Sequence, residues 1–252
     1  AARVRREANP ERQPESARYG SRCPVCLDDW DVNKVPKIRI CCCRLVCSSC
    51  DEKTCGEPCP LCRAPDFKSN AERLAALRRH VNNDMPEAVK HLGSAYEHGD
   101  QALGIVKSAK KAVKLYKRAV ELGDVQAMVN LGSFYTGWNP GPVKVDKKKA
   151  MQLFRMAADR GDASAYHNIA VFLESTDSAE SFRMLKLAAQ QGLADAQCGV
   201  ACAFELGRWN AFEMERDLGE AKRWFELAAA SRQPGRGREF ARGALATGRL
   251  DV

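Results

Sequence analysis

The sequence lacks several features that mark well-known classes of protein. No run of about eighteen apolar residues is present, so we expect no membrane-spanning helix. There is no glycine-rich phosphate loop, no His-Glu-x-x-His motif and no obvious pair of catalytic acids. These absences point away from membrane proteins, phosphate-binding enzymes and zinc proteases. No signal peptide is recognised, but the first residue is Ala1 and not methionine, which leaves open that the sequence is a fragment.

Histidine and aromatic residues are also scarce. The four histidines (His80, His91, His98 and His167) lie outside the cysteine cluster described below and have no obvious Ser or Cys nucleophile nearby in sequence. We therefore interpret them as surface or packing residues. Aromatic residues make up 7% of the chain and do not alternate with basic residues, as a groove for single-stranded nucleic acid would require. Basic runs such as Lys147-Lys148-Lys149 are typical of solvated helix faces. Despite the net charge of +8, nucleic acid is a disfavoured partner.

Cysteine, in contrast, is abundant and concentrated in one segment. Ten of the twelve cysteines fall between Cys23 and Cys62. They form the pairs Cys23-Pro-Val-Cys26, Cys47-Ser-Ser-Cys50 and Cys59-Pro-Leu-Cys62, together with the run Cys41-Cys42-Cys43. Eight thiolates are enough for two tetrahedral zinc ions. So short a segment cannot fold by burying apolar surface alone, and metal binding would supply the missing free energy.

The cysteine cluster has two other interpretations. A secreted module stapled by disulfides is one, but the Cys-x-x-Cys spacing favours metal. A zinc knot that only folds its own domain and recruits nothing is the other, and the sequence does not exclude it. Zinc-binding thiolates need a reducing compartment, so we expect a cytoplasmic or nuclear protein.

The order of the cysteine pairs resembles a RING-type zinc finger over roughly residues 21–67. Counted along the chain, with the run Cys41–Cys43 supplying the second pair of ligands, the resemblance implies that the first and third pairs hold one zinc ion. These are Cys23, Cys26, Cys47 and Cys50. It places the second ion at Cys41, Cys42, Cys59 and Cys62, with Cys43 as an alternative to Cys42. The histidine usual in that family is replaced by Arg44, which cannot bind zinc. The resemblance is therefore to the RING subclass with only cysteine ligands.

A RING finger implies a ubiquitin-protein ligase that works by orientation and has no covalent catalytic nucleophile. By this resemblance, Val25, Pro60 and Leu61 would contact a ubiquitin-conjugating enzyme. Arg63 would hydrogen-bond both that enzyme and ubiquitin through its multi-donor fork. The alternatives are that Arg63 is an ordinary exposed arginine and that the module is a non-catalytic scaffold.

From about Asp84 the chain repeats a pair of helical patterns. Four residues can cap the second helix of each pair: Ser108, Asp146, Asp177 and Asp217. Eight residues after these caps stand Tyr116, Phe154, Leu185 and Phe225, and eleven residues after them stand Ala119, Ala157, Ala188 and Ala228. These offsets lie on one helical face. Glycine follows fifteen residues after the first three caps, at Gly123, Gly161 and Gly192, where it can end a helix.

The first helix of each pair has its own pattern of small residues. It begins at Ala88, Ala127, Ala165 and Ala196, and the first two copies continue to Leu-Gly-x-x-Tyr. The combined pattern resembles the Sel-one-like repeat, a relative of the tetratricopeptide repeat. It implies a solenoid whose concave face binds peptides or protein surfaces. Cys198 and Cys202 occupy packing positions of the fourth copy, so we interpret them as buried thiols and not as metal ligands.

The expected protein is mainly α, an α-solenoid of helix-turn-helix repeats preceded by a small zinc-bound RING-like α+β module. We divide it into a disordered basic arm (1–20), the zinc finger (21–67), a linker helix opened by a Ser69-to-Glu72 capping box (68–83), four repeats (84–232) and a C-terminal tail (233–252). The leading hypothesis is a ubiquitin ligase that binds a conjugating enzyme, ubiquitin and a protein substrate. A zinc-stabilised scaffold is second, and a nucleic-acid binder using the basic arm and the zinc module is third.

Overall fold

A computed structural model of the chain describes residues 23, 37–46, 48–54, 57–64, 66–138, 141–231, 236–247 and 250. This part is mainly helical, and its eleven α-helices follow one another as α2 (Ser48–Lys53), α3 (Asn70–Asn82), α4 (Pro86–His98), α5 (Ala109–Glu121), α6 (Val125–Thr136), α7 (Lys147–Ala158), α8 (Ala163–Leu173), α9 (Ser178–Gln190), α10 (Ala194–Leu206), α11 (Leu218–Ala230) and α12 (Arg236–Ala246). Two short antiparallel hairpins, β1 (Lys37–Arg39) with β2 (Arg44–Val46) and β3 (Arg208–Trp209) with β4 (Phe212–Glu213), and the 3-10 turn η1 (Gln101–Leu103) complete it.

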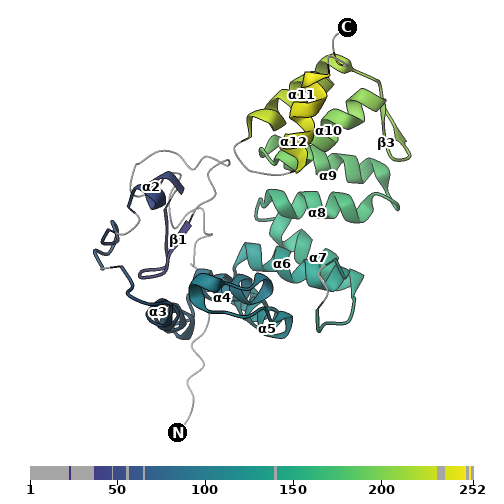
Figure 1. Cartoon of the computed structure of the whole chain (residues 1–252). Coiled ribbons are helices and arrows are strands. Elements are labelled where there is room, and N and C mark those ends of the chain that lie inside the picture. The colour runs from purple at the N-terminus through teal and green to yellow at the C-terminus, as the bar shows by residue number, and fades with distance from the viewer. Residues whose placement is uncertain are drawn as a thin grey trace.

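The helices pair as the repeats require. Helices α4 and α5, α6 and α7, α8 and α9, and α10 and α11 pack against each other, and each pair packs against the next. Figure 1 shows the pairs stacked in chain order from α3 to α12. The predicted fold class, mainly α with a solenoid of helical repeats, is confirmed. No described helix is long and apolar enough to cross a membrane.

Local sequence explains where the helices begin and end. The side chains of Asp146, Asp177 and Asp217 each accept a hydrogen bond from an amide three residues on, as predicted. Ser108 also precedes its helix, but the prediction that its side chain caps α5 is wrong, because only its backbone carbonyl accepts bonds there. The three predicted terminal glycines lie in the left-handed region, with φ of +87°, +80° and +87° at Gly123, Gly161 and Gly192.

Two helix caps were not predicted from the sequence. Asp124 and Asp162 follow the terminal glycines directly and cap α6 and α8 by accepting from the amides of Ala127 and Ala165. Gly-Asp therefore both ends one helix and starts the next, which keeps the connection between repeats short.

The core forms where the first helix of a pair meets the second. Tyr116, Phe154, Leu185 and Phe225 are buried, as are the four alanines three residues after them. The glycines of the first helices make room for the aromatic rings. A Cβ atom on Gly132 would lie 2.5 Å from Phe154 Cε1, and one on Gly93 would lie 2.8 Å from Tyr116 Cε1. Close helix packing at these points thus requires glycine.

The third repeat has the shortest loop between its helices, residues 174–177. Its helices α8 and α9 nevertheless share one core cluster with residues of α6, α7 and α10. The short loop trims the third repeat without interrupting the solenoid.

Additional helices cover both ends of the array. Helix α3, expected as a linker, packs on α4, and its Leu77 and Val81 join the core of the first repeat. Ser69 Oγ caps α3 by accepting a hydrogen bond from the amide of Glu72, and Glu72 Oε2 accepts one from the amide of Lys68. The segment expected as a C-terminal tail contains α12, whose Ala241 packs in one cluster with residues of α10 and α11. The basic arm expected at 1–20 lies outside the described residues.

Candidate metal centre

The turn between β1 and β2 carries the run of three cysteines. The strands pair in the register Lys37 to Val46, Ile38 to Leu45 and Arg39 to Arg44. The Cys42 amide donates to the carbonyl of Arg39 at 3.2 Å, and Cys43 has a φ of +49°. The chain therefore turns through these residues instead of passing them in extended form, so alternate side chains do not share one face.

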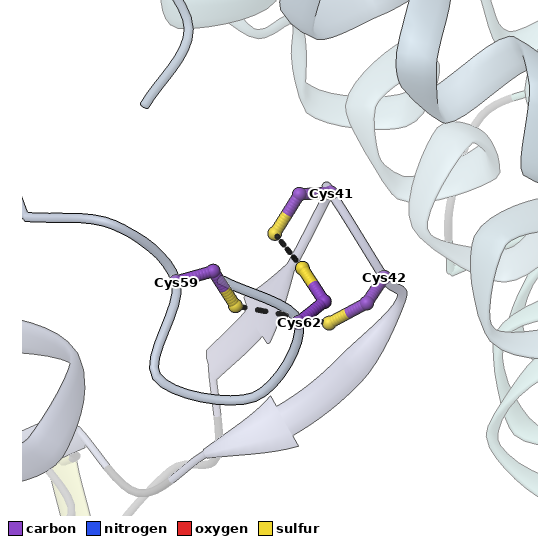
Figure 2. A group of neighbouring side chains, drawn as sticks. All are labelled: Cys41, Cys42, Cys59 and Cys62. Atoms are coloured by element: carbon purple, nitrogen blue, oxygen red, sulfur yellow. Dashed lines mark hydrogen bonds between the residues drawn. The ribbon is translucent and has the colours of Figure 1, made fainter. Parts of the chain in front are cut away.

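The pair Cys59 and Cys62 lies on a tight turn, the knuckle of residues 59–64. The amide of Arg63 donates to the carbonyl of Cys59 at 2.8 Å, and the amide of Cys59 donates to the carbonyl of Ala64 at 2.8 Å. These bonds fold residues 59–64 back on themselves, with Arg63 at a φ of +58°. Both thiols of the pair face the β1–β2 turn (Figure 2).

Four thiols converge between the turn and the knuckle. The sulfur atoms of Cys41, Cys42, Cys59 and Cys62 all lie within 4.8 Å of one another. Cys62 Sγ is 3.5 Å from Cys41 Sγ, and Cys42 Sγ is 3.9 Å from Cys59 Sγ (Figure 2). Both separations exceed a disulfide bond of about 2.05 Å. Four sulfurs placed tetrahedrally about 2.3 Å from a zinc ion would be about 3.8 Å apart. The spacing and the all-sulfur donor set fit a tetrahedral zinc ion.

The electrostatics of the cluster favour a thiolate at Cys59. Burial on its own raises the pKa of Cys59, but the backbone amides of Cys62 and Leu61 and the thiols of Cys41 and Cys62 donate to its sulfur and lower the pKa to about 7. The pKa of Cys41 is raised, first by burial and then by hydrogen bonds to Cys59 and Cys62. One thiolate is therefore available near neutral pH to begin metal binding.

Cys43 lies apart from these four thiols. Its side chain is fully buried, in the same core cluster as Leu77, Val81 and Ala88 of the first helices. Its Sγ lies 3.9 Å from the carbonyl of Ile40, and burial raises its pKa to about 12. The structure thus brings Cys42 to the cluster and places Cys43 in the hydrophobic core.

The other predicted site cannot be assembled from the described residues. Cys23 and Cys50 are both buried. Cys26 and Cys47 lie outside the described residues, as does Val25. The first zinc site therefore stays a prediction. Of the residues predicted to contact a conjugating enzyme, Pro60 and Arg63 are exposed and Leu61 is half-buried, all on the knuckle that carries Cys59 and Cys62.

Helix α3 contacts the turn between β1 and β2 directly through His80. His80 Nε2 lies 3.2 Å from the carbonyl oxygen of Cys41, and its Nδ1 lies 3.2 Å from Met85 Sδ. Ile38 and Ile40 of the hairpin pack against the core of the first repeat. This role of His80 was missed because it is 39 residues from Cys41 and no local pattern marks it.

A small cavity lies beside the cluster. Its volume is about 220 Å³, and Arg39, whose Nε is 2.9 Å from Asp51 Oδ1, lies on its wall with Phe67 and Arg73. Pockets for drug-sized ligands usually measure about 300–1,000 Å³. The charged side chains of the wall are largely engaged with each other, so we assign the cavity no ligand.

Comparisons with known proteins concern the helical part of the chain. A family model described as Sel1 repeat matches residues 86–124, 125–162, 165–193 and 194–232, more than half of the chain. The chain is similar to a Sel1 repeat protein from Oxalobacter formigenes, with 27% identity, a TM-score of 0.62, and coverage of 73% of this chain and 74% of that one. It is also similar to c5321, a protective antigen with an SLR fold present in uropathogenic Escherichia coli strains, with 26% identity and a TM-score of 0.56.

The second of these structures is the longer protein. That match covers 71% of this chain but only 38% of c5321. A comparison with curated proteins gave no match. The family match begins at residue 86, after the cysteine cluster, so it supports the repeats and not the RING resemblance.

Proposed function

The chain belongs to the Sel1 repeat family, and from this we propose that it is a zinc-stabilised scaffold that holds protein partners on its helical solenoid. Sel1 repeats generally mediate protein–protein interaction. The observation that carries the proposal is the continuous stack of four helix pairs, closed at one end by α3 and at the other by α12. Such a stack offers a long surface and, in its described part, no catalytic constellation.

The cysteine module would contribute stability at the N-terminal end. Soft thiolate donors in tetrahedral arrangement are typical of structural zinc, and a closed four-cysteine site leaves no open position for a substrate. We extend the proposal to two ions per chain, with Cys23, Cys26, Cys47 and Cys50 as the ligands of the other. Reduced thiols also imply a reducing location, the cytoplasm or nucleus.

Metal content tests the zinc part of the proposal. Full-length protein purified under reducing conditions should contain two zinc ions per chain by atomic emission, with a parallel thiol titration. One ion per chain would limit the metal to a single site. Protein that is folded and fully reduced but contains no zinc would overturn the zinc part.

Photo-crosslinking tests the scaffold part. A photoreactive amino acid at Val171, which is 37% exposed on α8, should capture a protein partner, and a matched position at Leu227, 53% exposed on α11, reports capture from a second helix. The captured partner should then bind the purified chain saturably in a titration. If no protein binds saturably, the scaffold function fails.

A ubiquitin ligase is the second candidate. The exposure of Pro60 and Arg63 beside the thiol cluster favours it, together with the RING resemblance of the cysteine order. Such a ligase would orient a conjugating enzyme and its linked ubiquitin without forming a covalent intermediate. A self-ubiquitination assay with a panel of conjugating enzymes tests it, with Arg63→Ala as the variant and the exposed Arg78→Ala as its control. The scaffold function predicts no transfer with any enzyme, and the Sel1 comparisons support the scaffold better.

A further inference from the structure

The first two repeats present a lysine in the same structural position. Three residues after the caps Ser108 and Asp146 stand Lys111 and Lys149. Lys111 Nζ lies 4.9 Å from the ring centroid of Tyr96, and Lys149 Nζ lies 5.7 Å from that of Tyr135. Tyr96 and Tyr135 are equivalent residues of the first helices. The contacts hold both ammonium groups on the same edge of the solenoid.

Positive charge accumulates around these two lysines. Residues 105–118 contain six basic residues and no acidic one, and residues 141–155 contain five basic residues with Asp146 as the one acid. Every lysine in these segments is exposed: Lys107, Lys110, Lys111, Lys114, Lys117, Lys144, Lys147, Lys148 and Lys149. Most of this charge is therefore open to a partner.

Two exposed valines lie within the same surface. Val106 is 83% exposed and precedes Lys107, and Val145 is 53% exposed and follows Lys144. Val106 lies two residues before Ser108 and Val145 lies one residue before Asp146, both in the loop that joins the helices of a pair. A single exposed aliphatic residue is ordinary, but in two successive repeats an exposed valine adjoins an exposed lysine shortly before the second helix.

The third and fourth repeats show that packing does not require this charge. Glu180 and Glu220 occupy the position of Lys111 and Lys149. Each pairs within its own helix, Glu180 with Arg183 at 2.6 Å and Glu220 with Arg223 at 2.5 Å. The four second helices otherwise bury the same positions, eight and eleven residues after the residue that precedes each helix. The change of sign is therefore a property of the surface and not of the fold.

We propose that this surface, the lysine edge (Val106, Lys107, Lys110, Lys111, Lys144, Val145, Lys148 and Lys149), binds an acidic protein segment that carries aliphatic side chains. The inference rests on the proposed scaffold function and names the chemistry of its partner. Carboxylates complement the lysines, and aliphatic side chains cover the valines. Nucleic acid would find few aromatic rings to stack on along this edge, and it would leave the valines without partners.

The test uses a defined probe and full-length zinc-loaded protein. A fluorescein-labelled peptide of repeated Asp-Glu-Leu is titrated by anisotropy at low and physiological salt, beside a peptide in which serine replaces leucine. The Lys111→Glu/Lys149→Glu variant should raise the Kd of the leucine peptide at least about tenfold, as expected when close charge pairs are reversed. Val106→Ser/Val145→Ser should raise it about threefold, as expected for lost apolar contact.

A matched variant separates local recognition from net charge. Lys186→Glu/Arg242→Glu changes the net charge by the same amount at exposed positions of α9 and α12. It should leave the Kd nearly unchanged. Glutamate is already present at the equivalent positions of the later repeats, so the lysine-edge variant should fold. Lys110→Ala/Lys148→Ala gives a second variant of the same edge, expected to weaken binding about threefold or more.

Several outcomes would overturn the inference. One is that the matched variant weakens peptide binding as much as the lysine-edge variant does. Another is that the serine peptide binds as tightly as the leucine peptide and the valine changes have no effect on the Kd. A third is that phosphatidylserine vesicles or a single-stranded oligonucleotide bind more tightly than the peptide, in a way that depends on Lys111 and Lys149. If the partner captured by crosslinking binds the lysine-edge variant with unchanged affinity, the lysine edge fails while the scaffold function stands. If no protein partner binds the chain at all, both fail.

Discussion

His80 Nε2 lies 3.2 Å from the carbonyl oxygen of Cys41, so helix α3 is joined directly to the turn that carries the thiol cluster. Two residues further along the same turn, the side chain of Cys43 is buried in the core of the first repeat. One turn therefore contributes to the thiol cluster on one side and to the core of the solenoid on the other. If the cluster binds zinc, as proposed, the bound metal should hold this turn in place and so stabilise the first repeat.

Removal of zinc should loosen the N-terminal end of the solenoid and leave its C-terminal end intact. We expect a strong chelator under reducing conditions to lower the opening free energy of α3 and α4 by about 2 kcal/mol, the size of one or two lost buried contacts. Hydrogen exchange on the full chain measures this helix by helix. Helices α10 to α12 are the internal control, and unchanged protection in α3 and α4 would contradict the linkage.

Substitution of neighbouring cysteines should separate metal binding from packing. Cys42→Ser removes a converging thiolate and should lower zinc retention against a competing chelator, because three ligands remain in the site. Cys43→Ala should retain the zinc and lower the free energy of unfolding by about 1 kcal/mol through a small cavity. Zinc content after dialysis and urea denaturation give the two readings. The opposite pattern would identify Cys43 as the ligand.

The hydrogen bond from His80 should contribute to the stability of the turn between β1 and β2. His80→Leu removes the donor to Cys41 and should lower stability by about 1 kcal/mol, the usual net value of one hydrogen bond. It should also speed the release of zinc to a chelator. His98→Leu is the matched control, since the side chain of His98 is 70% exposed. Equal effects of the two variants would show that the bond between α3 and the turn is unimportant.

The close approach of α6 and α7 should make Gly132 intolerant of a side chain. Gly132→Ala places a Cβ 2.5 Å from Phe154, and the overpacking should lower the free energy of unfolding by about 1–3 kcal/mol. Gly243 is also within a helix, but a Cβ there meets nothing within 4 Å. Gly243→Ala should therefore raise stability by about 0.5–1 kcal/mol through helix propensity. Thermal and urea unfolding of both variants check the difference in sign.

Acidification should weaken the solenoid through two half-buried histidines. Burial lowers the pKa of His91 and of His167, against the opposing effects of Asp100 on His91 and of Asp195 on His167. The unfolded chain, with histidine pKa values near 6.5, then binds more protons than the folded chain. This contribution to stability is complete above about pH 6.5 and is lost as the pH falls below that value toward the folded pKa.

Urea denaturation between about pH 7.5 and 5.5 measures this loss. The His91→Gln/His167→Gln variant should lose less stability over the same range than the unmodified chain. Thiol protonation and zinc release affect both proteins equally, because both carry the same cysteines. The difference between their slopes of unfolding free energy against pH therefore reports the two histidines alone. Parallel slopes would show that these histidines are not responsible.

The repeats could be predicted from the sequence because their determinants are local and periodic. A cap, a buried ring eight residues later and a glycine at the helix end recur at fixed offsets, and each depends on residues within one helical turn or two. Ser108 departed from this pattern because its backbone satisfied the first-turn amides without the side chain. Helix α12 was missed because it follows the last repeat and matches none of its positions.

The candidate site was predicted less completely. The spacing of Cys59 and Cys62 indicates a metal knuckle, but the choice between Cys42 and Cys43 depends on the left-handed backbone at Cys43, and no residue pattern announces that. The contact between His80 and Cys41 joins segments far apart in the chain. Sequence alone gave no reason to connect them. Ligase activity and the first zinc site stay predictions.

The burial of Cys43 against α3 and α4 has a consequence for how such a protein could be recombined. The β1–β2 hairpin cannot be moved to another protein as an independent unit, because its Cys43 is part of the hydrophobic core of the first repeat. A chimera that transferred residues 37–67 to another helical array would remove Cys43, Ile38 and Ile40 from the core of the donor and uncover part of it. Transfer of the hairpin together with α3 and α4 would preserve both the thiol cluster and the core that Cys43 joins. The structural boundary at which the protein could be divided thus lies within the repeat array, and not directly after the last cysteine of the cluster.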